Sequence, residues 1–382
     1  MDFELSKEQK DIVNAAREFA VGEFTDVSQE FDRNETFDLE LWRKACKLGF
    51  VGVYIGEKYG GPGLGFFEHC LIMEEFFAVD PGIATAILAT TFGSELLIIY
   101  GTEEQKQLVL PKLVSGEAIL GTAITEPDAG SDVTGASTNA VQKEDHWVIN
   151  GSKIFITNGG IADYINVFVV TDPENPSRHH HHSFILIMPK GLPGFEANKL
   201  TGKLGIRASH TAELSFSDVK VPLSNLIGER GNGFHELMNL FNRARLQVAA
   251  MGVGCARAAL EESIKYTKKR KQFGVPIASF QMTQAKIAEM ATLTRAARNL
   301  YYEAAWSVDH GIVDHALIAM AKWYAGEIAL KCADEALQMH GGYGYLDEYK
   351  VQKLYRDAKA VEIWEGTKEI EKLIVARSLL KQ

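Results

Sequence analysis

The spacing of apolar residues changes twice along this chain, and these changes constrain the fold more than any single motif. Up to about residue 116, apolar side chains recur at helical spacing. Near Ile119 the period falls to two, which is typical of strands. From Gly233 the helical period returns in long segments with short connections, as in an antiparallel bundle. The pattern predicts an α+β multidomain protein with an N-terminal α-helical domain (1–117), a central β-sheet domain (118–226) and a C-terminal four-helix bundle (227–382).

Local signals predict the individual elements. Capping boxes at Ser6/Gln9 and Thr102/Gln105 mark two helix starts. The glycine-rich segment 59–65 lacks the G-x-G-x-x-G spacing of a dinucleotide site and is interpreted as a turn. Further helices are expected at 39–48, 66–77, 83–100, 236–270, 280–310, 314–340 and 368–380. Strands are expected at 119–125, 147–149, 154–157, 165–170, 184–188 and 213–221.

Composition excludes several classes of protein. With 382 residues, 46% hydrophobic and 24% charged, the chain is globular, and its formal charge of −10 argues against a nucleic-acid or anionic-membrane surface. No apolar run is long enough to predict a membrane span, and no basic leader opens the chain. The expected location is therefore the cytoplasm, or the mitochondrial matrix if this is a processed form.

No metal site is predicted. The four cysteines are far apart, which favours buried, reduced thiols. His235 and Glu236 begin a zincin-like string, but position 239 is asparagine where a second histidine is required. The tract His179–His182 is expected in an exposed hairpin loop, where it could bind metal adventitiously.

Two strand-end loops point to a flavin. The segment 122–133 ends a strand in a loop with free backbone N–H groups, and the segment 154–160 repeats that plan. Exposed amides and a threonine hydroxyl suit a planar heterocycle that carries carbonyls and ring nitrogens.

A carboxylate near the C-terminus has neighbours that are unusual for a solvated acid. Glu365 stands between Trp364 and Gly366, just before the helix that Thr367 can cap. Contact with the indole would partly desolvate the carboxylate, raise its pKa and make it a stronger base. Gly366 permits positive φ or close approach of a ligand. The alternative for these residues alone is a helix-capping turn with an ordinary surface glutamate.

Taken together, these motifs resemble those of the acyl-CoA dehydrogenases over essentially the whole chain. The resemblance rests on T-E-P-x-A-G-S-D from Thr125, F-I-T-N-G from Phe155, R-K-Q-F-G from Arg270, Q-M-H-G-G-Y-G from Gln338, R-D-A from Arg356 and W-E-G-T from Trp364. It implies a homotetramer, built as a dimer of dimers, with one non-covalent FAD per subunit and an electron-transfer flavoprotein as acceptor.

The resemblance also implies roles for particular residues. Glu365 matches the family's catalytic base, which removes the α-proton of an acyl-CoA thioester while the β-hydrogen leaves as hydride. Ala244 occupies the position where branched-chain members carry their base instead. The expected cofactor-binding residues are Ile124, Thr125, Ser131, Phe155, Thr157, Arg270, Phe273, Gln338, Gly341, Gly342, Thr367 and Glu369, with those from Arg270 to Gly342 holding the partner subunit's adenosine diphosphate. The expected substrate-binding residues are Ser131, Leu88, Thr91, Phe241, Asn242, Ala244, Arg245, Trp364 and Gly366.

Some positions depart from the family pattern. Phe155 replaces a frequent tryptophan, Trp364 replaces the usual tyrosine, and Asn242 stands where related enzymes often have aspartate. Bulk at Leu240 and Phe241, facing Leu88 and Thr91, favours a short or compact acyl group, branched or alicyclic, although the same residues would also suit a core.

Two other functions remain open at this point. An acyl-CoA oxidase would share the fold and the base, but such chains usually carry an extra C-terminal domain that this sequence does not show. A non-catalytic acyl-CoA-binding or flavin-binding relative would be expected to have lost Glu365.

Overall fold

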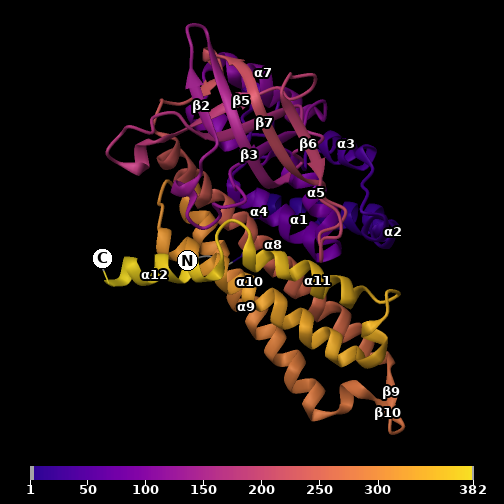
Figure 1. Cartoon of the computed structure of the whole chain (residues 1–382). Coiled ribbons are helices and arrows are strands. Elements are labelled where there is room, and N and C mark those ends of the chain that lie inside the picture. The colour runs from indigo at the N-terminus through magenta and orange to yellow at the C-terminus, as the bar shows by residue number, and fades with distance from the viewer. Residues whose placement is uncertain (1–3, 381–382) are drawn as a thin grey trace.

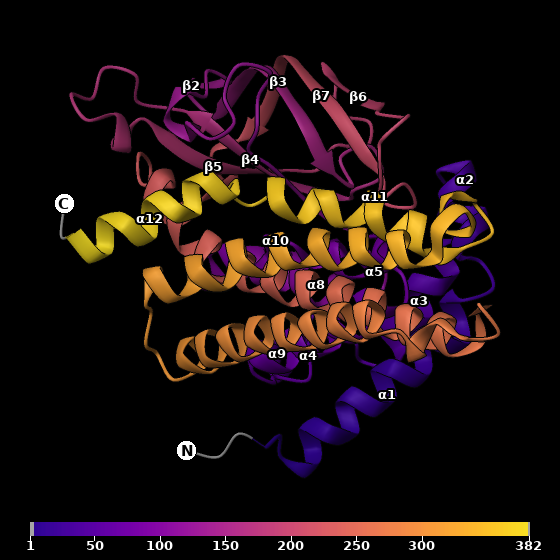
Figure 2. The same ribbon diagram turned by 90° about the horizontal axis from the view of Figure 1, so that it is seen from below.

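A computed structural model describes residues 4–380 and shows one sheet with helices gathered against it (Figure 1). The sheet forms one side of the molecule, and helices from both ends of the sequence lie together on the other side (Figure 2). Helix α4 packs against the long helix α8, so the N-terminal and C-terminal helices share a core. The α, β, α order predicted from the apolar periods is therefore confirmed.

The N-terminal part is helical, and both capping boxes form as predicted. Because Gly49 follows directly after its C-cap, the helix expected at 39–48 ends at Lys47. The elements are α1 (Lys7–Phe24), α2 (Ser28–Asn34), α3 (Leu39–Lys47), η1 (Glu57–Tyr59), α4 (Phe66–Val79), α5 (Pro81–Leu88), η2 (Ala89–Thr91), α6 (Ser94–Tyr100) and α7 (Glu103–Ser115).

The prediction of one helix from Ile83 to Tyr100 is wrong, because the chain breaks at residues 89–93. Thr90 and Thr91 each donate a side-chain hydroxyl hydrogen bond to a carbonyl three residues back, which competes with helix continuation. Gly93 then takes a φ of +89°. The break places Thr91 and the first turn of α6 beside the sheet.

The central part is a mixed sheet in the order β6-β7-β3-β2-β4-β5-β8, with β1 paired in parallel to β4. Its strands are β1 (Leu120–Ala123), β2 (Asn139–Gln142), β3 (His146–Thr157), β4 (Tyr164–Val170), β5 (His182–Ile187), β6 (Phe195–Lys199), β7 (Thr211–Pro222) and β8 (Leu226–Ile227). The runs expected at 147–149 and 154–157 are one strand, β3, and β2, β6 and β8 were missed. These three are short, and β2 and β6 are largely exposed, so they carry little apolar signal.

The histidine tract is only partly in a loop. Residues 178–180 are exposed, as expected, and His181 is half-buried. His182 is the first residue of β5 and is fully buried, so its assignment to the loop is wrong. His182 stacks on Phe168 of the neighbouring strand at 4.5 Å between ring centroids.

The C-terminal part is a bundle of α8 (Gly233–Lys269), α9 (Gln281–Asp309), α10 (His315–His340) and α11 (Lys350–Ile363), followed by α12 (Lys368–Leu380) at the bounds predicted. The small hairpin of β9 (Lys271–Gln272) and β10 (Val275–Pro276) marks one end of the bundle, and α12 lies at the other (Figure 1). All four cysteines are buried and free, as predicted.

The stretch Pro81–Tyr100 is apolar enough to cross a membrane, with a mean hydropathy of 1.7, but 78% of it is buried inside the protein. The expectation that no apolar run is long enough to span a membrane is therefore wrong for this stretch, which lies mostly in the core.

Candidate active site

The turn between α11 and α12 carries Glu365 in a strained conformation. Glu365 has a φ of +54° and Gly366 a φ of +101°. A positive φ is costly for a residue with a side chain and persists where the surroundings demand it, often at functional sites. A Cβ on Gly366 would lie 2.2 Å from Oε1 of Glu371, so only glycine fits. Thr367 caps α12 by accepting a hydrogen bond from the N–H of Ile370 at 3.4 Å, as predicted.

Glu365 is half-buried, and one of its carboxyl oxygens, Oε2, is buried without a hydrogen-bond partner among residues 4–380. Burial raises the pKa of Glu365 to about 7, against the opposing effect of the Lys322 and Arg245 cations and with the help of the Glu95 and Glu371 carboxylates. The raised pKa expected from the sequence is confirmed. A carboxylate of this pKa accepts protons efficiently near neutral pH.

Three charged side chains lie behind this turn. Lys322 of α10 is fully buried and donates a hydrogen bond from Nζ to the carbonyl of Gly366. Arg245 of α8 forms an ion pair with Glu371 of α12, with 2.9 Å between Nε and Oε1. Burial lowers the pKa of Lys322 to about 8 and raises that of Glu371 to about 7.

Apart from Ser131, the expected substrate residues belong to α5, η2, α8 and the Glu365 turn itself. Leu88 and Thr91 are buried, and the Thr91 carbonyl accepts a hydrogen bond from the Tyr54 hydroxyl at 3.4 Å. Ala244 is fully buried on α8. Phe241 lies under the Arg245 guanidinium at 5.3 Å.

Asn242 and Arg245 already have protein partners. Asn242 Oδ1 lies 3.0 Å from Nδ1 of His315, and Arg245 pairs with Glu371. Both residues are buried, so their side chains support the walls of the site in this chain.

The two strand-end loops expected to hold the flavin are adjacent. The N–H of Ile154 donates to the carbonyl of Thr125 at 2.9 Å. Lys153, fully buried, donates to the Ile124 carbonyl at 2.9 Å and to Glu126 at 2.8 Å. Although burial opposes ionisation, the Lys153 ammonium group holds the pKa of Glu126 down at about 2. Ser131 is exposed in the loop that Glu126 ties down through the N–H groups of residues 137 and 138.

Phe155 presents an unusual aromatic surface beside these loops. It has a φ of +61° and is 65% exposed, at an irregularity in the pairing of β3 with β7. A bulge of this kind re-aims side chains. An exposed ring next to Thr125 and the half-buried Thr157 offers one apolar face and several polar groups, which fits the isoalloxazine of FAD.

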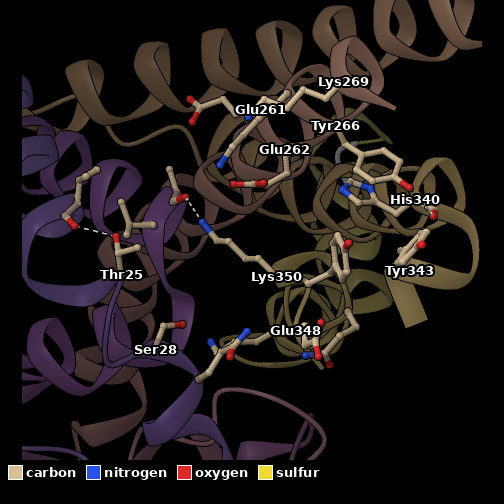
Figure 3. A pocket seen from close by; sticks show the side chains of 18 of the residues that line it. Thr25, Ser28, Glu261, Glu262, Tyr266, Lys269, His340, Tyr343, Glu348 and Lys350 are labelled. Atoms are coloured by element: carbon tan, nitrogen blue, oxygen red, sulfur yellow. Dashed lines mark hydrogen bonds between the residues drawn. The ribbon is translucent and has the colours of Figure 1, made fainter. Parts of the chain in front are cut away.

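The remaining cofactor candidates lie at the far end of the bundle. Arg270 and Met339–Gly342 border a cleft of about 560 Å³, with Gln338 one residue before them on α10. Phe273, on the adjoining hairpin, is 94% exposed. The Arg270 guanidinium stacks over Tyr343 at 5.2 Å. Figure 3 shows the larger cavity next to this cleft, about 930 Å³, where Tyr266 stacks on His340 at 4.0 Å opposite Lys350.

The Glu365 turn, behind which Arg245 pairs with Glu371, is separated from the cleft beside Arg270 by much of the length of α8. Along α8, Arg245 and Arg270 are about 37 Å apart at 1.5 Å per residue. Glu369, by contrast, is exposed in the first turn of α12, close to the Glu365 turn.

Comparison with known families agrees with this geometry. Residues 6–117 match the acyl-CoA dehydrogenase N-terminal domain, residues 121–219 the middle domain and residues 231–380 the C-terminal domain. The chain belongs to the acyl-CoA dehydrogenase family. It is accordingly an FAD-dependent oxidoreductase that acts on CH–CH groups.

Relatives of this acyl-CoA dehydrogenase match it from end to end. The short-chain-specific acyl-CoA dehydrogenase of Clostridium acetobutylicum is 39% identical and covers 100% of both chains. The structure of butyryl-CoA dehydrogenase from Megasphaera elsdenii superposes with a TM-score of 0.95 at 38% identity, again over 100% of both chains. A structure titled for the electron transferring flavoprotein of Acidaminococcus fermentans gives 0.96 at 39% identity and 100% of both chains.

An oxidase has the same architecture. The prolyl acyl carrier protein oxidase AnaB superposes with a TM-score of 0.94 at 30% identity, over 98% of this dehydrogenase and 100% of that chain. An extra C-terminal domain is therefore not a requirement for an oxidase of this architecture.

Reasoning from the sequence missed Lys322, Glu371 and Glu95. Lys322 is the one charge in the apolar run Ile318–Trp323, which is a weak sign of a buried cation. Glu95 lies in the first turn of α6 and Glu371 in the first turn of α12. Acidic residues are common in the first turn of a helix, so neither attracts notice in the sequence. Only the fold brings these side chains to Glu365.

Proposed function

We propose that this dehydrogenase converts a short or compact acyl-CoA to the 2-enoyl-CoA, with Glu365 as the base and an electron-transfer flavoprotein as acceptor. The observation that carries the proposal is the Glu365 carboxyl group, which has a buried oxygen without a partner in the described part of the chain and a pKa raised to about 7. The retained base argues against a non-catalytic relative.

The residues divide the reaction between them. Bound FAD supplies the acceptor for the hydride that leaves the β-carbon. Glu365 takes the α-proton on its carboxylate, and its backbone N–H is the proposed donor to the thioester oxygen as negative charge develops there. Trp364 would cover the carboxyl and help to exclude water, which would keep the base strong.

We assign the cofactor to two sets of residues. Ile124, Thr125, Ser131, Phe155, Thr157, Thr367 and Glu369 would surround the ring end within one subunit. Arg270, Phe273, Gln338, Gly341 and Gly342 would hold the diphosphate end of the partner subunit's FAD, since arginine binds a pyrophosphate through two hydrogen bonds at once. A homotetramer built as a dimer of dimers provides this arrangement, and we propose a cytoplasmic location.

The acyl group would lie among Leu88, Thr91, Leu240, Phe241, Ala244 and Trp364. The acyl pocket would be narrowed by the bulky side chains of Leu240, Phe241 and Trp364. The full-length relatives include a short-chain-specific enzyme and a butyryl-CoA dehydrogenase. Ser131, Asn242, Arg245 and Gly366 would complete the substrate site, with Asn242 and Arg245 acting through the walls they support.

A panel of acyl-CoAs tests the proposed chain length. Because a filled pocket rejects each added methylene, kcat/KM should fall by about ten- to two-hundred-fold for each group that does not fit. Anaerobic bleaching of the flavin by four-carbon to sixteen-carbon substrates measures this directly. Comparable values at both extremes would contradict the short-chain assignment.

Substitution of the base tests the reaction itself. In Glu365→Gln the volume beside Trp364 and the backbone N–H remain, but the proton acceptor is lost, so flavin bleaching should slow by about ten-thousand-fold or more while FAD stays bound. Ala244→Glu combined with Glu365→Gly should restore part of the rate. Bleaching of Glu365→Gln within tenfold of wild type would exclude Glu365 as the base.

The oxidase alternative is tested with the reduced enzyme. A dehydrogenase should be reoxidised slowly by dissolved oxygen and quickly by an electron-transfer flavoprotein. Rapid reoxidation in air, with stoichiometric hydrogen peroxide, would assign the chain to the oxidases instead.

A further inference from the structure

The buried charges behind the Glu365 turn are arranged in a way that the reaction alone does not explain. Each of four helices contributes one charged group to the surroundings of Glu365: Glu95 from α6, Arg245 from α8, Lys322 from α10 and Glu371 from α12. All four residues are at most 7% exposed. Burial of so many charges is costly unless they are paired.

Lys322 holds the turn itself. Its Nζ donates to the carbonyl of Gly366, the residue directly after the base. Glu371 lies close to Gly366, because a Cβ added to Gly366 would be 2.2 Å from Oε1 of Glu371. Lys322 and Glu371 therefore contact the turn from two different helices.

Glu371 is the counter-ion of this cluster. It is fully buried, it pairs with Arg245 at 2.9 Å, and neither of its oxygens accepts a conventional hydrogen bond within residues 4–380. Its charge also acts on Lys322 more strongly than any other carboxylate does. Glu95 is occupied elsewhere, because it accepts hydrogen bonds from Gln247 and from the N–H of Gly93, each at 3.1 Å.

Without Glu371, Glu365 is the carboxylate that acts most strongly on Lys322, and Arg245 also acts on Glu365. The other carboxylate that acts on Lys322 is Glu362, which Lys359 and Lys368 already bind. A base drawn into an ion pair with Arg245 or Lys322 would be weaker and would point away from the substrate.

We propose that Lys322 and Glu371 are positioning residues for the base: Lys322 fixes the turn through the Gly366 carbonyl, and Glu371 keeps Arg245 and Lys322 from pairing with Glu365. The inference rests on the proposed role of Glu365 and adds a reason why that carboxylate stays unpaired among two buried cations.

Two substitutions should shift the base in opposite directions. Glu371→Gln leaves two cations facing Glu365, so the pH at which Glu365 ionises should fall by about one to three units, the usual effect of an opposite charge nearby. Lys322→Met removes a cation, so that pH should rise. The variant that combines both changes should lie between the single variants.

Two measurements on the FAD-loaded enzyme follow the shift. The first is an infrared difference titration without substrate, which measures the intensity of the protonated carboxyl band as a function of pH. The band is assigned to Glu365 because the Glu365→Gln variant lacks it. Stopped-flow bleaching as a function of pH follows the same ionisation in the reaction. Lys322→Met should also lower the plateau rate, because the turn loses its anchor.

Controls separate this role from general damage. Glu327→Gln removes an exposed α10 carboxylate that pairs with Lys372 at 3.2 Å on the surface, and it should shift neither measurement. Glu371→Asp keeps the charge and should keep the ionisation near that of wild type, with a lower plateau rate. If Glu371→Gln does not fold, Glu371→Asp and Lys322→Met carry the test.

Shifts of the same sign in both single variants, or no shift in either, would overturn the proposal, as would an aspartate variant equal to wild type in rate. Failure of the proposed function is a different result. In that case Glu365→Gln itself would bleach at nearly the wild-type rate, whatever the charges behind it do.

Discussion

At the scale of single residues, the base depends on a backbone conformation that its own side chain disfavours. Glu365 has positive φ without being glycine, and the cap at Thr367 and the Lys322 hydrogen bond hold it there. The sequence predicted the acid, its desolvation and the capped helix, because these depend on neighbours along the chain. It did not predict Lys322 or Glu371, because these act from other helices.

The ionisation of Glu365 predicts the pH dependence of the reaction. The base works only when deprotonated, and its pKa is raised to about 7. The rate of flavin bleaching should therefore increase with pH and reach half of its plateau near pH 7. A profile already flat at pH 5 would show that the group responsible has an ordinary carboxyl pKa.

Gly366→Ala tests the fit of the turn. The added carbon would meet Oε1 of Glu371 at 2.2 Å, at a φ of +101° that alanine rarely adopts. We expect the variant to lose most of its bleaching activity and to unfold at lower temperature. Gly22→Ala is the matched control, because nothing lies within 4 Å of its added carbon and the residue is in helix α1. Equal behaviour of the two variants would contradict the close approach.

At the scale of elements, the flavin loops are held from below by one buried ion pair. Lys153 lies inside β3, and Glu126 lies in the loop after β1. Glu126→Gln should destabilise the protein by about 3 to 5 kcal/mol, the usual effect of leaving a buried charge unpaired. Chemical denaturation measures this loss, and FAD retention should fall with it. Glu103→Gln, on the exposed Lys58 pair, should change stability little.

The Lys153–Glu126 ion pair also predicts how the free energy of unfolding depends on pH in acid. The pKa of Glu126 is lowered from 4.5 to about 2, so its contribution is fully present above about pH 4.5 and is lost as the pH falls toward 2. In wild type, unfolding free energy should decrease over this window, and the decrease should be smaller in Glu126→Gln. An identical acid dependence in both proteins would assign the effect to other carboxylates.

The elements that the sequence missed share a physical reason. Strands β2 and β6 are short and mostly exposed, so they lack the alternation that marks a half-buried strand. The helix expected at 83–100 is largely apolar. Its break comes from hydroxyl hydrogen bonds and from Gly93, and the spacing of apolar residues does not reveal either. The long amphipathic helices, by contrast, were predicted to within a few residues.

At the scale of the whole molecule, the base and the proposed diphosphate site lie at opposite ends of the bundle. Arg270→Ala should weaken FAD retention and subunit association together, because the proposed cofactor spans two subunits. Gel filtration and the flavin-to-protein absorbance ratio measure the two effects. Lys268→Ala, at an exposed neighbour, should change neither. A variant of Arg270 that keeps both FAD and oligomer would place the diphosphate elsewhere.

Because α8 separates Arg270 from the Glu365 turn of the same chain, the proposed centre combines residues of two subunits, and this can be tested genetically. If two subunits bind each FAD, then each active centre takes its Glu365 from one subunit and its Arg270 from the partner. Consider a pair in which one subunit carries Glu365→Gln and the other carries Arg270→Ala. A mixed pair contains one centre with both defects and one with neither. Two inactive alleles expressed in the same cell should therefore complement each other, whereas two alleles with the same defect should not.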